Sequence, residues 1–446
     1  MRTHANSILP ALFIILVLFP IYGRYEMPER FAQPFSGFID LGTGHKVYAT
    51  WEGLDIQNKF VILLNGLTHS TKNWQQEADE LKKRGVGVIR LDFPWQGHNL
   101  DVDGFPTEPI TDKETVEVVR QFLSRTGLNS PVNLVGLSYG GGIAIRFAAT
   151  YPELVNKIFL ESPYTEALQA QDDLIKWLVD VTWFMAPTLK YLTNAQFELF
   201  IRNSWKSMMW WWNMMGWKIA EHVSQPYLEA LVKTFRENRK NMNFDFSTKE
   251  GLYNFYFKLI VYATYPLAEP EILEHPYKIE ATYWRALGIR DTKMIDFAST
   301  LPKDSVHLMI AGNDQYIPRK VLLQGFWDRL PLEVKGSVVV INGSKHSSNE
   351  EAPLPTAAWI AYNLHQNEVR MDVVYYVDRN SAVFSDAQNG GATLDLTLDH
   401  LDQHLDARFG PLALTQQRDE ARPLNTHRVL KCSQIHSYAL RFVRSR

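Results

Sequence analysis

A serine, an aspartate and a histidine follow three separate apolar runs of this chain, as Ser138, Asp314 and His346. A serine hydroxyl attacks an acyl carbon only when a base removes its proton, and that base needs a partner that orients it. Serine, histidine and aspartate can fill these three roles. The three residues therefore make nucleophilic acyl chemistry the first hypothesis to examine.

Ser138 lies in the segment GLSYG, between the apolar run 132–135 and a helical pattern that begins near Ile143. In a G-x-S-x-G turn between a strand and a helix, the serine occupies a strained position, and the glycines let neighbouring backbone come close. Two further glycines, Gly141 and Gly142, would weaken the helix unless something packs closely against them. The pattern predicts a nucleophile elbow.

Asp314 stands in the turn GNDQYIP after the strand-like run 305–311, and His346 stands in NGSKH after the run 337–341. A turn aspartate can serve only its own backbone, and a loop histidine can be plain surface. The order serine, acid, histidine favours the chemical interpretation, because one family of hydrolases uses that order. Glu161, after the run 157–160, is the alternative acid.

The developing negative charge of such a reaction needs backbone donors. The backbone N–H of Leu67, in the segment NGLTHS after the run 60–64, is one candidate. The N–H of Tyr139, directly after the serine, is the other. Two such donors could supply roughly 3–4 kcal/mol each to the transition state.

These groups can meet only if the strands before them are parallel and end at one edge of a sheet. Short apolar runs at 60–64, 86–91, 132–135 and 157–160 alternate with helical patterns, which predicts parallel strands covered by helices on both faces. The alternation stops between residues 165 and 300, where no clear buried strand occurs and eight of the thirteen tryptophans lie.

The segments GLSYGG, GNDQYIP and NGSKH resemble those of the α/β-hydrolase fold family, in particular its serine esterases and lipases with a helical cap. The resemblance implies an α/β fold whose mostly parallel central sheet is flanked by helices. It places the hydrolase core at 36–164 and 301–370 and the helical cap at 165–300.

The same resemblance implies Ser138 as nucleophile, His346 as general base and then acid, and Asp314 as its orienter. Leu67 and Tyr139 would form the oxyanion hole. No metal and no organic cofactor is expected. Two segments depart from the family pattern, because residue 65 is Asn where many members have His, and residues 92–99 match a family loop only loosely.

The N-terminus suggests export or membrane attachment. Residues 8–19 form a nearly unbroken apolar run behind Arg2 and His4, so residues 1–23 are expected to be a signal peptide or an N-terminal membrane anchor. The protein would then be exported, periplasmic or extracellular, or held at a membrane. Residues 371–446 are a C-terminal extension of uncertain structure.

Composition narrows the partners. A formal net charge of −3 gives no reason to expect nucleic acid, and the single cysteine, Cys432, excludes an internal disulfide framework. Trp210, Trp211 and Trp212 are candidates for substrate binding, as the wall of an acyl pocket or a membrane-facing lid, although a packed cap helix would use the same residues.

The sequence therefore predicts a serine hydrolase that forms an acyl-enzyme on carboxylic esters with lipophilic acyl groups. Its substrate would be a small-molecule ester or a lipid. Acyl transfer, or amide and peptide cleavage, by the same triad remains open. A binding protein that keeps the fold without catalysis is the alternative from another class.

Overall fold

The computed structural model describes residues 28–365, with gaps at 55–58, 100–105, 107, 168, 190, 215–227, 230–231, 233–235, 237–243, 265–275 and 315, together with strands at 374–378 and 393–394. Residues 1–23 and most of 371–446 lie outside the described residues, so the expected signal peptide or anchor stays a prediction. None of the helices in the described ranges is long and apolar enough to cross a membrane.

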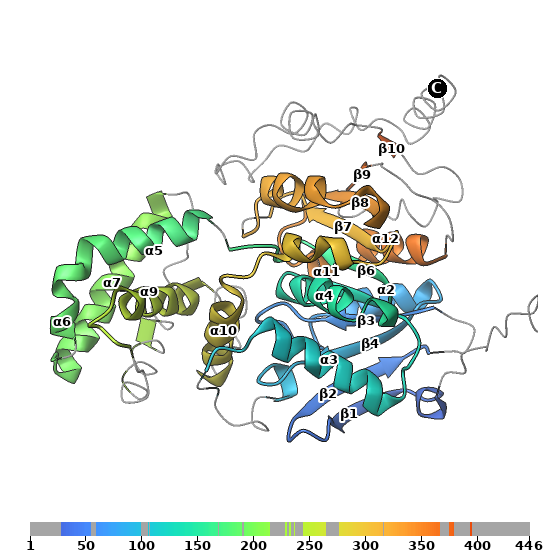
Figure 1. The fold of residues 1–446 in the computed structure, drawn as a ribbon, viewed down its shortest axis with the longest axis horizontal. Helices are drawn as coiled ribbons and strands as arrows, with labels where there is room; N and C mark the ends of the chain where they lie inside the picture. Colours follow the sequence, from blue (N-terminus) through green and yellow to red (C-terminus); the bar gives the residue numbers. More distant parts are fainter. Residues whose placement is uncertain are drawn as a thin grey trace, which may run out of the picture.

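A ten-stranded sheet runs through the described part of the chain in the order β1-β2-β4-β3-β5-β6-β7-β8-β9-β10 (Figure 1). All pairs from β4 to β9 are parallel, whereas β1 with β2, β2 with β4 and β9 with β10 are antiparallel. This confirms the expected mostly parallel sheet. The strands are β1 Phe35–Asp40, β2 Lys46–Glu52, β3 Phe60–Leu64, β4 Gly87–Asp92, β5 Val132–Leu137, β6 Val155–Glu161, β7 Val306–Ala311, β8 Lys335–Asn342, β9 Val374–Asp378 and β10 Thr393–Leu394.

Helices cover both faces of the sheet, which is why its central strands are continuous apolar runs. Successive residues of a strand point to opposite faces. Val61 and Leu63 of β3 accordingly belong to a cluster with helices α2, Gln75–Lys83, and α12, Pro353–His365. Ile62 and Leu64 belong to a second cluster with α3, Asp112–Thr126, and α4, Tyr139–Thr150.

The ends of α3 follow directly from its sequence. Thr111 and Glu114 form a reciprocal capping box at its start, and Gly127 ends it at φ 79°. Strands β1 and β2 were not predicted, because residues along β1 alternate between half-buried and exposed at the sheet edge and form no apolar run. A continuous run is the signal of a strand buried on both faces only.

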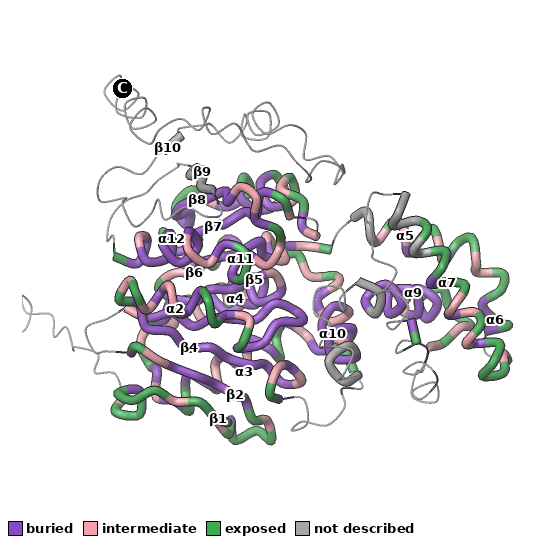
Figure 2. The backbone as a smooth tube through the Cα atoms, turned by 180° about the vertical axis from the view of Figure 1, so that it is seen from behind, coloured by how far each residue is buried: buried purple, intermediate pink, exposed green. Residues whose placement is uncertain are grey.

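Between β6 and β7, residues 165–300 form what we call the helical region, at the left of Figure 1. Its described residues contain no strand, as expected, although its limits as a separate cap domain stay a prediction. Figure 2 shows many exposed residues on its outer helices and mostly buried ones in the sheet. Its elements are α5 Gln169–Thr182, η4 Trp183–Met185, α6 Ala186–Leu189, α7 Asn194–Met214, α9 Lys249–Thr264, α10 Pro276–Ile289 and η7 Met294–Thr300.

Short elements complete the description. They are η1 Glu29–Phe31, η2 Gly97–Asn99, η3 Pro152–Leu154, a π-helical turn η8 Val321–Phe326, η9 Trp327–Arg329, η10 Leu332–Val334 and α11 Ser348–Glu351.

Candidate active site

Every predicted site residue of the core follows a strand at one edge of the sheet. Strands β3, β5, β6, β7 and β8 are mutually parallel, so their carboxyl ends lie at the same edge. Open α/β sheets bind ligands at that edge. Leu67 follows β3, Ser138 follows β5, Asp314 follows β7 and His346 follows β8.

Ser138 occupies the sharp turn between β5 and α4. Its φ of 52° and ψ of −115° lie outside the regions that residues with a side chain favour, at a cost of roughly 1–3 kcal/mol. Backbone hydrogen bonds hold it there. Its N–H donates to Glu161 O at 2.9 Å, and its carbonyl accepts from Tyr164 N at 2.8 Å and Gly142 N at 3.2 Å. The strained geometry is the one expected of a nucleophile elbow.

The glycines around Ser138 are required by close approach of other backbone. A Cβ on Gly140 would lie 2.1 Å from Leu64 O, and one on Gly141 would lie 2.6 Å from Pro163 Cβ. A Cβ on Gly142 would meet a backbone oxygen at 2.9 Å. Distances below 3.0 Å are essentially never seen for real Cβ atoms. Close packing is therefore the reason for the glycines that would otherwise weaken α4.

Asp314 and His346 meet directly. His346 Nδ1 lies 2.8 Å from Asp314 Oδ2, and the two side chains are 13% and 1% exposed. An ionised carboxylate can only accept, so Nδ1 carries the proton, and in the neutral imidazole Nε2 then has the free lone pair. The other carboxylate oxygen, Oδ1, accepts from Tyr316 N at 2.8 Å and Ile317 N at 3.0 Å. Asp314 thus caps its own turn and orients the histidine at the same time.

The segment that carries His346 folds back across the carboxyl edge of the sheet. We call residues 343–350 the histidine loop. Ser348 Oγ donates at 2.9 Å to Oε2 of Glu161, the last residue of β6. Asn349 Nδ2 donates to Asn73 O at 3.1 Å, between β3 and α2. The loop therefore runs from β8 past β6 toward β3, across the side of the sheet where Ser138 lies.

Leu67 lies in the loop after β3, residues 65–70, and its orientation follows from Gln96. The Gln96 side-chain amide donates to Gly66 O at 2.8 Å and to Leu67 O at 2.9 Å. In a trans peptide the carbonyl and the next N–H point in opposite directions. Because Gly66 O faces Gln96, the Leu67 N–H points away from Gln96. This role of Gln96 was not predicted from the sequence.

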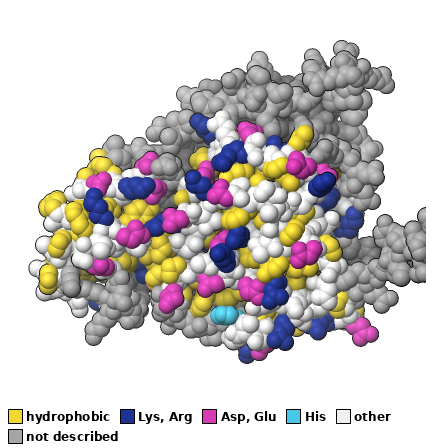
Figure 3. All heavy atoms as spheres, in the orientation of Figure 1, with side chains coloured by type: hydrophobic (Ala, Val, Ile, Leu, Met, Phe, Trp, Pro, Cys, Tyr) yellow, Lys and Arg dark blue, Asp and Glu magenta, His cyan; other side chains and the backbone are white. Residues whose placement is uncertain are grey.

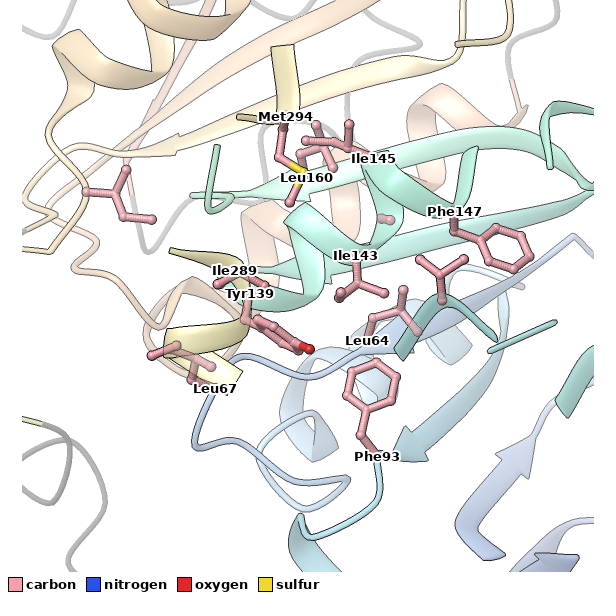
Figure 4. Close-up of a cluster of buried hydrophobic side chains, with 14 of the residues drawn as sticks. Leu64, Leu67, Phe93, Tyr139, Ile143, Ile145, Phe147, Leu160, Ile289 and Met294 are labelled. Atoms are coloured by element: carbon pink, nitrogen blue, oxygen red, sulfur yellow. The ribbon is translucent and has the colours of Figure 1, made fainter. Parts of the chain in front are cut away.

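Tyr139 is the first residue of α4, so its N–H is among those that have no acceptor within the helix. Its side chain is buried, and the hydroxyl lies 2.7 Å from Thr115 Oγ1. Burial raises the pKa of the Tyr139 phenol to about 12. Figure 4 shows Tyr139 in one buried cluster with Leu67, from the loop after β3, and Ile289, from α10.

Asn65 stands where many members of the family have histidine, and the structure gives it a packing role. It is fully buried, its Nδ2 donates to Leu91 O at 2.9 Å, and its Oδ1 accepts from Trp74 Nε1 at 2.8 Å. Asn65 Nδ2 also lies 3.1 Å from Asp92 Oδ1. The departure from the family pattern therefore anchors the loop after β3 to β4 and α2.

Glu161, the alternative acid, bonds to Ser348 and not to His346, whose carboxylate partner is Asp314. Glu161 is fully buried beside Glu77 of α2. Burial raises the pKa of both carboxyls.

Arg285 of α10 connects the helical region to this edge. It is 1% exposed, its guanidinium donates to Pro94 O, and it faces the Tyr139 hydroxyl. Burial lowers the pKa of Arg285 to about 10.

The tryptophan candidates lie on α7. Trp210 is 58% exposed, and the side chains of Trp211 and Trp212 lie outside the described residues, so substrate binding by these residues stays a prediction. In the described ranges no group of three or more His, Cys, Asp or Glu is arranged to hold a metal ion.

Residues 59–209 match the model of a family described as alpha/beta hydrolase fold. A thermophilic esterase from Thermogutta terrifontis is 17% identical, with 74% of this chain and 98% of that chain covered and a TM-score of 0.44. A putative lipase from Acinetobacter baumannii AYE is also 17% identical, with 75% and 92% covered and a TM-score of 0.44.

A bacterial membrane phospholipase A is 16% identical, with 80% of this chain and 92% of that chain covered and a TM-score of 0.45. Identities and TM-scores this low carry no argument about the substrate of this chain.

Proposed function

Because this chain belongs to the α/β-hydrolase fold family, we propose that it is a serine hydrolase that cleaves carboxylic esters with lipophilic acyl groups. The observation that carries the proposal is the strained Ser138 turn, at the same sheet edge as the bonded pair of Asp314 and His346. A strained residue persists only where surrounding structure holds it, and such residues cluster at active sites.

In the proposed reaction, Ser138 Oγ attacks the ester carbonyl while His346 Nε2 takes the hydroxyl proton. The carbonyl oxygen becomes an oxyanion, and the backbone N–H groups of Leu67 and Tyr139 donate to it. Collapse of the tetrahedral intermediate breaks the bond to the alcohol, which leaves with the proton from His346. Water then attacks the carbonyl of the acyl-enzyme while His346 takes a proton from it. The second tetrahedral intermediate collapses, His346 returns the proton to Ser138 Oγ, and the carboxylic acid is released. Asp314 holds the imidazole and stabilises its charged form.

Exposed apolar side chains of the helical region support a lipophilic substrate. Large exposed hydrophobic residues gather on α5 to α7 and in the turns between them, and Figure 3 shows hydrophobic side chains on that part of the surface. Monomeric soluble proteins rarely expose large contiguous apolar patches unless something binds there. The exposed hydrophobic residues of the helical region are Trp177, Val181, Phe184, Met185, Tyr191, Leu199 and Trp210.

The apolar run at residues 8–19 supports the same proposal, since it would export the protein or hold it at a membrane. We propose contact with lipid through the helical region, in an exported or membrane-anchored protein.

A fluorophosphonate probe tests the nucleophile, because it reacts with activated serines. We expect labelling of the wild type, none of Ser138→Ala, and full labelling of the control Ser305→Ala, which removes a buried hydroxyl bonded to Pro302 O at 2.6 Å. Equal labelling of Ser138→Ala and wild type would contradict the nucleophile. No labelling of any form would favour a non-catalytic binding protein.

A series of esters with increasing acyl length tests the substrate class. We expect kcat/KM to rise with chain length in the labelled, active enzyme. If acetate esters were cleaved fastest throughout, the lipophilic part of the proposal would be wrong while the serine mechanism stood.

A further inference from the structure

Glu161, at the end of β6, touches both halves of the candidate site. Its backbone carbonyl accepts from Ser138 N at 2.9 Å, within the turn that holds the serine in its strained conformation. Its side-chain Oε2 accepts from Ser348 Oγ at 2.9 Å. Ser348 lies two residues beyond His346 and opens α11. A single residue is thus bonded to the nucleophile turn and to the histidine loop.

The second carboxyl in this place is that of Glu77, and both side chains are 0% exposed. No lysine or arginine pairs with either carboxyl in the described part of the chain. Among the described residues, no N–H or O–H group donates a hydrogen bond to either oxygen of Glu77 or to Oε1 of Glu161. Two carboxyls can bond to each other only when one carries a proton.

Burial raises the pKa of Glu77 far above its usual value and that of Glu161 as well. Both raised pKa values favour one proton shared between the two neighbouring carboxyls. Glu161 thus lies beside Glu77 on one side and accepts from Ser348 on the other. Its carboxylate cannot turn without breaking a bond at a fully buried position.

The bond between His346 and Asp314 fixes the direction of the imidazole but not the path of the loop that carries it. A displaced base costs rate even when all groups remain present, since proton transfer depends on position. We infer that Glu161, backed by Glu77, is a positioning residue that sets the histidine loop against the Ser138 turn through Ser348. The inference rests on the proposed hydrolysis.

The test is Ser348→Ala, which removes only the hydroxyl that links the loop to Glu161. With a short soluble ester we expect kcat to fall about 10- to 100-fold with little change in KM, and the rate of fluorophosphonate labelling to fall by the same factor. The matched control is Ser337→Ala. Ser337 lies on β8 and is buried, as Ser348 is. Its hydroxyl donates to Asn363 Oδ1 at 3.1 Å and accepts from Trp359 Nε1 at 3.0 Å.

The conservative variant Glu161→Gln separates the bond from the charge. Its amide oxygen can accept from Ser348 and its amide N–H can donate to Glu77. A positioning role predicts kcat within about threefold of wild type, because both bonds survive. Ser348→Ala with the kcat of Ser337→Ala would overturn the inference, as would a Glu161→Gln loss as large as that of Ser348→Ala.

A downfield proton NMR signal from the His346 Nδ1–H provides a readout that does not require hydrolysis, assigned by its absence in His346→Gln. We expect this signal to broaden in Ser348→Ala and to stay sharp in Glu161→Gln and Ser337→Ala. An unchanged signal in Ser348→Ala would overturn the positioning role. A wild type without labelling but with the expected signal pattern would refute the proposed hydrolysis alone.

Discussion

The carboxyl edge of the sheet and the helical region solve opposite problems. Strands β3, β5 and β7 are buried along their whole length, and Ser138 sits among glycines that have no room for a Cβ. The segment from α5 to α7 instead exposes side chains such as Phe184 of η4, 77% exposed, and Tyr191 between α6 and α7, 80% exposed. One region holds atoms in fixed places, and the other presents apolar surface outward.

This difference predicts in which region a substitution should change the reaction rate or the stability. At the sheet edge Ser138 and Asp314 are held by backbone hydrogen bonds, so the loss of one group there should lower the rate of the proposed reaction. On the outer helices a side chain has few neighbours, so its loss should leave fold and basal chemistry alone. Substitutions in the two regions test this contrast between the sheet edge and the helical region.

The largest effect is expected for Asp314→Asn. An amide can still cap the turn at Tyr316 and Ile317, but its NH₂ would face His346 Nδ1 and favour the wrong tautomer. We expect kcat to fall about 10³- to 10⁴-fold with stability little changed. The control in the helical region is Asp291→Asn, whose side chain is 83% exposed. Steady-state kinetics should leave the control unchanged, and equal losses would refute the contrast.

Arg285→Met tests the place where the two regions meet. The variant keeps an unbranched apolar stem but leaves Pro94 O without its buried donor, so we expect a loss of about 1–3 kcal/mol in the free energy of unfolding. The effect on kcat should be intermediate, since Arg285 faces the Tyr139 side chain and not the reacting atoms. Arg290→Met is the control, measured by urea denaturation. It loses the ion pairs to Glu250 and Asp291 and the contacts with Asn254 and Tyr253. If Arg290→Met lowered the free energy of unfolding as much as Arg285→Met, Arg285 would have no special role in linking the two regions.

Glu77→Gln should alter the pH dependence of stability. The folded-state pKa of Glu77 is raised above its ordinary 4.5, so its contribution is complete below pH 4.5 and is lost as pH rises toward the folded-state value. The stability of wild type relative to Glu77→Gln should therefore fall with rising pH, on the order of 1 kcal/mol per pH unit. Denaturation at pH 5, 6, 7 and 8 measures this difference. A constant difference would mean that the pair of carboxyls holds no extra proton.

The smallest effect on stability is expected for Phe184→Ser combined with Leu199→Ser on the helical region, within about 0.5 kcal/mol of wild type. Cleavage of a short soluble ester should be unchanged, whereas cleavage of a long-chain ester in lipid vesicles should fall. The matched pair is Phe38→Ser with Leu332→Ser, which are 48% and 54% exposed outside the helical region. If both pairs lowered vesicle activity equally, the helical surface would have no special role.

The sequence predicts the sheet edge well, because its signals are local. A buried parallel strand is a continuous apolar run, and the residue after each run is automatically near the others. The turn that carries Asp314 and the loop that carries His346 could thus be found from the sequence, without knowledge of the hydrogen bonds they make. The sequence left Asp314 open as a turn residue or as the partner of a histidine, and in the structure it bonds both to its own turn and to His346.

What the sequence could not provide are contacts between side chains distant along the chain. Gln96 is one polar residue in a loop, and nothing near it indicates that its amide holds two carbonyls of the loop after β3. The meeting of Glu77 and Glu161 depends on how α2 packs on the sheet. The tryptophan segment showed apolar character, but only the structure shows that Trp210 points to solvent.

The divided carboxylate of Asp314 has a consequence for how such a protein can diverge. Because one oxygen is bound to the backbone at Tyr316 and Ile317 and the other to His346, a shift of that turn also moves the imidazole's partner. In the proposed reaction, substitutions near residues 316 and 317 would therefore alter the rate, whereas exposed positions on α5 to α7 could vary without moving His346.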